Sequence, residues 1–361
     1  MTNRRTLSIR EQQEEREPLV LSSYACLSVQ TRGRRKREKS VCALRTCFQR
    51  DRDRIIHSKT FRRLKHKTQV FLAPAGDHYR TRLTHVLEVA QIARTVSVCL
   101  RLNEYLTEAI ALGHDLGHTP FGHAGEYSLN KLHPGGFQHY RQSLRIVDFL
   151  ERDGRGLNLT WEVRNGILKH SKGNREILPA NQSLLPATME GQVVRVADII
   201  AYVNHDMDDA LRAGMLKETD LPPHLRRVLG DRPSRRVGAM VDDLVRTTLA
   251  RDEGTLRLSA RMNEIITELR TFLYDNVYRA WRVHREFEKA QRIISDLYAY
   301  FLEHELPSRS NGWQTPLSIP VSSDEKRRRR RQVCDFIAGM TDRYALDLYS
   351  QIFMPKPWSV L

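Results

Sequence analysis

The stretch GHDLGHTPFGH at residues 113–123 combines three histidines and an aspartate with three glycines and a proline. A segment of this composition packs poorly as core and is unusually apolar for a surface loop. His114 and Asp115 are adjacent, so on a helix their side chains diverge by about 100°. Both can reach one metal ion only where the end of the helix lies against it. We therefore expect a metal or catalytic site at His114, Asp115, His118 and His123.

Two residues elsewhere in the chain can complete a metal site. His85 lies one turn into a preceding helical segment, and a short turn between antiparallel helices would bring it opposite His114. Asp198 lies in the apolar stretch QVVRVADIIAY, where an unpaired carboxylate is costly to bury and a metal would remove that cost. Two imidazoles and two carboxylates suit Mn, Fe, Mg or Zn, with positions left open for water.

The elements that must position these residues are predicted to be helices. Strand patterns with Asn-Gly turns are scarce, whereas helical periodicity is common. Residues 82–102 place apolar side chains at helical spacing, and residues 104–114 form a second helix with Asn103 as N-cap and Gly113 near its end. Further helices are predicted at 139–152, 190–213, 239–250, 258–284, 286–304 and 332–351. We expect an all-α fold.

Three regions are predicted along the chain. Residues 1–40 carry charges of both signs and form an arm with one short helix. Residues 41–215 form the catalytic core. Residues 216–361 form a C-terminal helical region that contains a loop and a basic run at 305–331, and the run RRRRR at 327–331 is interpreted as the charged start of a helix.

Composition restricts the class of protein and its partners. The chain has 361 residues, of which 40% are hydrophobic and 28% charged, as in globular proteins. No apolar run approaches the ~20 residues that span a bilayer, and the N-terminus lacks the pattern of a signal peptide, so we expect a cytoplasmic protein without a membrane partner. Its five cysteines form no CxxC pair and are expected to be reduced. A net charge of +16 favours phosphate-bearing partners.

Three of these stretches resemble a known family. THVLEV at 84–89, LGHDLGHTPFGHAGE at 112–126 and RVADIIAYVNHDMDDA at 195–210 are similar to the HD-domain phosphohydrolases, in the deoxyguanosinetriphosphate triphosphohydrolase-like branch of the dNTP triphosphohydrolases. The resemblance covers roughly residues 20–350. It implies an HD-domain helical core with additional C-terminal helices. One departure is FQHY at 137–140, where that branch usually reads FEHN.

The resemblance also implies a cofactor and a reaction. One divalent ion per subunit would be held by His85, His114, Asp115 and Asp198, the four residues reached above from their chemistry. Mn²⁺ or Mg²⁺ is expected, with Fe²⁺ or Zn²⁺ as alternatives. The implied reaction is hydrolysis of a deoxynucleoside triphosphate to deoxynucleoside and inorganic triphosphate, in which water attacks the α-phosphorus and the sugar 5′-oxygen leaves.

Roles for the remaining site residues follow from the same resemblance. His123 matches the catalytic histidine, and Glu126, one helical turn later, could orient it. His118, grouped with these catalytic candidates, and His139 match positions that face the phosphates. Arg82, on the same helix face as His85, matches a phosphate-binding arginine. HYRTR at 78–82 and the Arg-rich stretch 279–292 are further candidates for binding phosphate.

The sugar is expected to lie along one helix. Asp198, Tyr202 and Asp206 are spaced i, i+4, i+8 and therefore share a stripe of the helix surface. The resemblance implies that Asp206 and Gln69 hold the 3′-hydroxyl and that Tyr202 packs beside the sugar. The neighbouring Asp208 and Asp209 are interpreted as a solvated acidic face.

Two other classes of function stay open. One is a different HD phosphohydrolase, such as a nucleotidase or a cyclic or alarmone nucleotide hydrolase, which would release phosphate or pyrophosphate instead of triphosphate. The other is a nucleic-acid-binding protein with secondary hydrolase activity, which would show salt-dependent binding of single-stranded DNA. The family often forms homo-oligomers such as hexamers, and some members respond to a dNTP effector or bind single-stranded nucleic acid.

Overall fold

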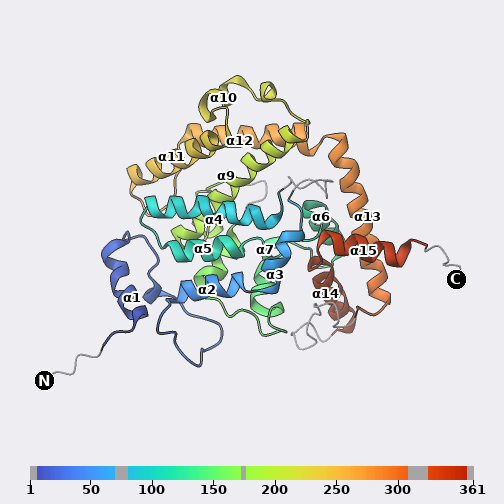
Figure 1. Cartoon of the computed structure of the whole chain (residues 1–361), viewed down its shortest axis with the longest axis horizontal. Coiled ribbons are helices and arrows are strands. Elements are labelled where there is room, and N and C mark those ends of the chain that lie inside the picture. The colour runs from blue at the N-terminus through green and yellow to red at the C-terminus, as the bar shows by residue number, and fades with distance from the viewer. Residues whose placement is uncertain (1–5, 70–79, 172–175, 308–323, 356–361) are drawn as a thin grey trace, which may run out of the picture.

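The computed structural model describes residues 6–69, 80–171, 176–307 and 324–355, which fold into helices joined by loops (Figure 1). Within these residues no strand forms, and the two isolated bridges pair Arg34 with Thr160 and Thr68 with Thr81. The all-α prediction is confirmed. The α-helices are α1 (Ile9–Val20), α2 (Cys47–Ile56), α3 (Lys59–Arg63), α4 (Arg82–Cys99), α5 (Glu104–Gly113), α6 (Gly122–Leu132), α7 (His139–Arg145), α8 (Trp161–Lys169), α9 (Met189–Arg212), α10 (Pro223–Leu229), α11 (Pro233–Arg251), α12 (Ala260–Leu273), α13 (Trp281–Glu303), α14 (Glu325–Ala338) and α15 (Asp342–Phe353).

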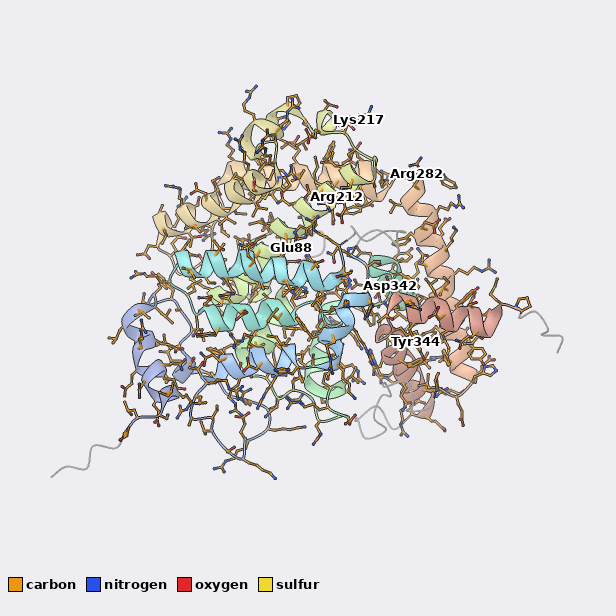
Figure 2. All side chains as sticks on the ribbon, in the orientation of Figure 1. Glu88, Arg212, Lys217, Arg282, Asp342 and Tyr344 are labelled. Atoms are coloured by element: carbon orange, nitrogen blue, oxygen red, sulfur yellow. The ribbon has the colours of Figure 1, made fainter. Side chains whose placement is uncertain are left out.

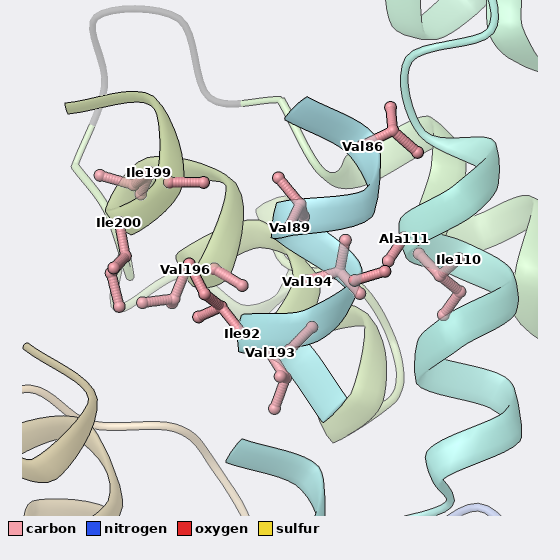
Figure 3. Packing of buried hydrophobic residues seen from close by; sticks show 14 of the residues in the cluster. Val86, Val89, Ile92, Ile110, Ala111, Val193, Val194, Val196, Ile199 and Ile200 are labelled. Atoms are coloured by element: carbon pink, nitrogen blue, oxygen red, sulfur yellow. The ribbon is translucent and has the colours of Figure 1, made fainter. Parts of the chain in front are cut away.

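Helices α4, α5 and α9 form the centre of a large hydrophobic cluster, which we call the first core (Figure 3). Apolar residues recur three and four positions apart on α4, and that face meets α5 and α9. Val89, Ile110 and Val196 are among its fully buried members. α5 begins as predicted, because the Asn103 side chain accepts a hydrogen bond from the Leu106 amide at 3.2 Å.

A second hydrophobic cluster, the second core, joins the C-terminal helices to α6. Buried residues of α13, α14 and α15, such as Phe301, Ile337 and Ala345, pack with Leu129 of α6 and with Phe121, which precedes that helix. In Figure 1 these helices lie on the right of the molecule, beside the first core. The C-terminal region therefore packs directly on the chain that follows the His114–Asp115 pair.

Three predicted helices are divided differently in the structure, and α11 begins at Pro233 instead of residue 239. Residues 332–351 belong to two helices, because α14 ends at Ala338 and α15 begins at Asp342. The Thr341 side chain caps α15 by accepting a hydrogen bond from the Tyr344 amide at 3.2 Å. Residues 258–284 divide into α12, a π-helical turn at Tyr274–Tyr278 and the start of α13. Residues 139–152 form α7 followed by a second π-helical turn at Ile146–Leu150. Helices α2, α3, α6, α8 and α10 were not predicted.

The charged segments are mostly on the surface. The basic run 327–331 lies in α14, as predicted, and Figure 2 shows Lys217 and Arg282 at the periphery of the molecule. The greater part of the loop predicted within 305–331 falls at 308–323, outside the described residues, as do residues 78 and 79 of HYRTR. None of the described helices is both long and apolar enough to cross a membrane.

The interpretation of Asp208 and Asp209 as a solvated face is wrong. Both are buried, because α9 lies between α4, α11 and α12. Asp208 accepts a hydrogen bond from Arg236 at 2.9 Å, and Asp209 accepts one from Arg80 at 3.2 Å. These arginines come from other parts of the sequence, so the spacing along α9 could not reveal them.

Candidate metal centre and its surroundings

The four predicted metal ligands converge from three helices. His85 comes from the first turn of α4, His114 and Asp115 follow α5, and Asp198 lies in the middle of α9. Asp198 Oδ1 is 3.2 Å from His85 Nε2 and 3.8 Å from His114 Nε2. His114 Nε2 is 3.5 Å from Asp115 Oδ1. Both imidazoles and Asp115 are buried, whereas the Asp198 side chain is 19% exposed, so one side of the group is open to solvent.

One buried atom in this group has no partner. His114 Nδ1 lies 2.6 Å from the Ala111 carbonyl oxygen, which turns Nε2 toward the two carboxylates. Among the described residues, that Nε2 atom has no hydrogen-bond partner. An unsatisfied buried nitrogen is costly, whereas a cation ligated by Nε2 and the carboxylates would satisfy it. The residues present therefore fit a divalent metal ion, and they do not distinguish one ion from another.

The charges around Asp115 keep its carboxylate ionised. Burial by itself raises the pKa of Asp115, but His118, His114 and Arg82 outweigh it and hold that pKa well below its usual value. Arg82 donates to Asp115 Oδ2 at 2.7 Å. The predicted phosphate-binding arginine is thus also the ion-pair partner of a candidate metal ligand.

His170 is a site residue that sequence reasoning missed. It follows α8, is buried, and its ring centroid lies 4.9 Å from that of His114. Its ligand atom can group with those of His114 and Asp198 around one ion. Burial, followed by the nearby His114, lowers the pKa of His170 to about 3, so the ring is neutral, as a metal ligand must be. A single histidine in ILKHS offers no local signal of this contact.

A second group of polar side chains adjoins the first. His118 Nε2 is 3.1 Å from Asp115 Oδ1, and its ring stacks on that of His139 with centroids 4.1 Å apart. The Glu126 carboxylate accepts hydrogen bonds from the His139 backbone amide at 2.8 Å and lies 2.9 Å from its Nδ1. Burial lowers the pKa of His139, but Glu126 outweighs it, and the net pKa is raised.

His123 is placed differently from the other histidines. Its side chain is 71% exposed at the start of α6, and its Nδ1 lies 3.9 Å from Glu126 Oε2. Glu126 is therefore near His123, as predicted, but its hydrogen bonds go to His139. An exposed imidazole beside a buried metal centre is accessible to a substrate.

A close backbone contact brings His139 to this site. A Cβ atom on Gly117 would lie 2.2 Å from the Ser143 amide nitrogen and 2.3 Å from the His139 carbonyl oxygen, so no other residue fits there without rearrangement. The Ser143 hydroxyl donates to the His114 carbonyl at 2.7 Å and accepts from the Gly117 amide at 2.8 Å. Gly117 thus allows α7 to pack against the loop that carries the metal-site residues.

Asp198, Tyr202 and Asp206, the residues predicted to line the sugar, all lie on α9, and two of them have partners from other elements. Asp206 is buried and accepts a short hydrogen bond from the Tyr278 hydroxyl, which belongs to the π-helical turn after α12. Burial raises the pKa of Asp206 to about 6. Tyr202 interacts with Arg270 of α12, and burial raises its pKa. Neither Tyr278 nor Arg270 was predicted.

Gln69 is the last described residue before position 80. Its Oε1 is buried and has no hydrogen-bond partner within the described part of the chain. The Gln69 carbonyl oxygen would lie 3.0 Å from a Cβ atom on Gly122, so the segment of Gln69 directly abuts the loop that precedes α6.

Comparison with known proteins adds independent findings. Residues 82–203 match the HD domain, and residues 256–351 match the Phosphohydrolase-associated domain. A protein from Desulfatibacillum aliphaticivorans, named deoxyguanosinetriphosphate triphosphohydrolase-like protein, is 53% identical over 97% of this chain and 99% of its own length. A protein of the same name from Caldanaerobacter subterraneus subsp. tengcongensis is 53% identical over 98% of each chain.

One solved structure also aligns with the chain. It is a crystal structure of a hypothetical protein from Aquifex aeolicus, with a TM-score of 0.44 and 17% identity over 84% of this chain and 71% of that chain. A likeness at this level carries no argument about fold details or activity. The site itself combines a group that can hold a divalent cation with neighbouring histidines and an arginine suited to an anion.

Proposed function

The chain belongs to the deoxyguanosinetriphosphate triphosphohydrolase-like family of HD-domain phosphohydrolases, and on this premise we propose that it hydrolyses deoxynucleoside triphosphates to deoxynucleoside and inorganic triphosphate. The observation that carries the proposal is the convergence of His85, His114, Asp115 and Asp198 around the unpartnered His114 Nε2 atom. These four residues would hold one divalent ion, Mn²⁺ or Mg²⁺. When bound, such an ion neutralises charge on the α-phosphate and lowers the pKa of a water molecule.

Three cationic or polar groups would bind the triphosphate. Arg82 carries a charge at the edge of the metal group, and His139 is protonated more readily than an ordinary histidine because Glu126 lies beside it. The His118 ring stacks on that of His139, and its Nε2 atom faces Asp115. A polyphosphate needs such neutralisation, since its charges would otherwise repel one another in a partly dehydrated site.

His123 is the proposed proton donor. Water attacks the α-phosphorus, the bond from phosphorus to the 5′-oxygen breaks, and that oxygen takes a proton to leave as the deoxynucleoside hydroxyl. His123 is exposed beside the phosphate-facing histidines, where a substrate can meet it. Asp206 and Gln69 would hold the 3′-hydroxyl, with Tyr202 beside the sugar, because Asp206 follows Asp198 by two turns along α9.

Product analysis tests this proposal directly. The full chain, loaded with Mn²⁺ or Mg²⁺, is incubated with each of the four dNTPs singly and together, and the products are separated by ion-exchange chromatography. We expect deoxynucleoside and inorganic triphosphate in equal amounts. Release of orthophosphate or pyrophosphate would instead indicate a different HD phosphohydrolase. Activity restricted to the dNTP mixture would indicate an effector.

A further inference from the structure

We propose that Asp342 and Lys67 are positioning residues that clamp the loop 117–122 against the segment 67–69, so that the C-terminal helices help to place His118 and His123. The effect of this clamp on catalysis rests on the proposed function. Asp342 begins α15 and Lys67 follows α3, so the clamp joins the C-terminal region to the chain around the candidate metal centre. Figure 2 shows Asp342 where the start of α15 faces α3.

The Asp342 carboxylate bridges two separate segments. Oδ1 accepts from the Phe121 amide at 3.0 Å, while Oδ2 accepts from the Thr68 amide at 3.0 Å and from the Thr68 hydroxyl at 2.5 Å. The residue as a whole is only 4% exposed. Three hydrogen bonds to one buried carboxylate are strong and directional, so they fix the separation between Thr68 and Phe121.

Lys67 makes a parallel connection on the other side of the loop. Its ammonium group is buried and donates to the carbonyl oxygens of His118 and Ala338, the latter at 2.9 Å. His118 lies in the loop, and Ala338 is the last residue of α14. Burying an ammonium group is costly, and here its hydrogen bonds tie the backbone of a phosphate-facing histidine to the C-terminal helices.

The loop needs such support because its backbone is strained. Phe121 has a φ of 60°, in the left-handed region that bulky residues rarely adopt, and its ring packs in the second core. Gly122 also has a positive φ and approaches the Gln69 carbonyl closely. The shape of the backbone between His118 and His123 therefore depends on contacts with segment 67–69 and with α15.

Mutation can distinguish the effect of the clamp on the loop from an effect on metal binding. The candidate ligands His85, His114 and Asp198 lie on helices of the first core, whereas Asp342 lies on a helix of the second core. Loss of the Asp342 acceptor should therefore relax the loop and misplace His118 and His123 while the metal stays bound. This combination distinguishes positioning from a general loss of structure.

The test compares Asp342→Asn with Asp347→Asn in the full, metal-loaded chain. Asp347 is on the same helix, its side chain is 60% exposed, and it lies 3.6 Å from the exposed side chain of Arg343. The side-chain NH₂ group of the asparagine must face either the Phe121 amide or the Thr68 amide, both of which donate, so at least one of the three hydrogen bonds is lost. We expect kcat to fall roughly 10- to 100-fold in Asp342→Asn, the scale of a misplaced reacting group, with KM within about threefold and metal content unchanged. Equal kcat in the two variants, or loss of metal together with activity, would overturn the proposal.

A milder variant and a measurement without substrate complete the test. Thr68→Val removes only the hydroxyl donor, and its effect on kcat should vanish when Asp342 is already Asn, since both act through one contact. Hydrogen exchange in residues 117–124 should quicken about tenfold in Asp342→Asn and stay unchanged in Asp347→Asn. If the native chain releases no triphosphate, the proposed function fails while the exchange comparison still decides the clamp. Unchanged exchange would refute the clamp even if the reaction is as proposed.

Discussion

The first and second cores carry different parts of the candidate site. The candidate metal ligands come from α4, from the end of α5 and from α9, whose apolar faces form the first core, and all of them except the partly exposed Asp198 are buried. His123 and Glu126 are on α6, which packs on the C-terminal helices in the second core. In the proposed function, cation binding and proton donation would therefore depend on two separate packing units. The difference teaches that mutations in one unit should be able to leave the chemistry of the other intact.

The largest expected effect is in the first core. His114→Ala removes a ligand whose Nε2 atom is buried beside two carboxylates, so bound metal and hydrolysis should be lost together. We expect kcat/KM to fall by at least roughly 10⁴-fold, because a metal contributes several kcal/mol to stabilising the transition state. Metal analysis by mass spectrometry alongside product release checks this. Full activity in His114→Ala would remove the basis for assigning a metal centre.

The next effect tests the second core. His123→Ala should lower kcat by roughly 10²–10⁴-fold, the usual scale for losing a general acid or base, while the metal stays bound. A folding defect would not explain this loss of kcat, because the His123 side chain is exposed and truncating an exposed side chain rarely destabilises a protein. Loss of metal in this variant would contradict the separation of the two cores.

A smaller effect is expected where α9 meets the turn after α12. Asp206→Ala removes the proposed charge-assisted hydrogen bond to the 3′-hydroxyl, which should lower kcat/KM by roughly 10- to 150-fold without changing metal content. A 2′,3′-dideoxy substrate should be poor for the native chain and lose most of its disadvantage in the variant. Equal kcat/KM for deoxy substrates in both proteins would show that the sugar is bound elsewhere.

The last prediction concerns how the free energy of unfolding depends on pH through Asp206. Because burial raises the pKa of Asp206 to about 6, the folded chain holds this proton more tightly than the unfolded chain. The free energy of unfolding should therefore fall as pH rises from about 4 to about 6, by on the order of 2–3 kcal/mol from this group. Asp206→Asn lacks this titration, so its stability relative to the native chain should increase over that range.

Thermal unfolding at about pH 4.5 and about pH 7.5 checks this expectation. Asp347→Asn serves as the control, because the exposed Asp347 should give a difference from the native chain that changes little with pH. If the difference in stability between Asp206→Asn and the native chain is the same at the two pH values, folding does not change the pKa of the Asp206 carboxyl.

Much of the first core was predictable because its signals are local. The periodicity of 82–102 and the N-cap Asn103 correctly indicate α4 and α5. The unusual density of histidine and aspartate at 113–123 and the apolar surroundings of Asp198 indicate residues that do come together. Such patterns depend on spacing within one or two helices, which the sequence states directly.

The contacts between distant segments were not predictable in the same way. His170 reaches His114, Tyr278 reaches Asp206, and Asp208 and Asp209 find arginines from other elements. The break between α14 and α15 was also missed, although it places Asp342 against Thr68 and Phe121.

The amino-acid sequence by itself determined the helical class, the family and the residue types able to bind a metal, since these depend on composition and on short-range spacing. Only the tertiary structure decided which polar groups share a buried space. Burying a carboxylate or an ammonium group is tolerated only where a partner lies opposite, and that partner often comes from a helix hundreds of residues away, as Ala338 does for Lys67.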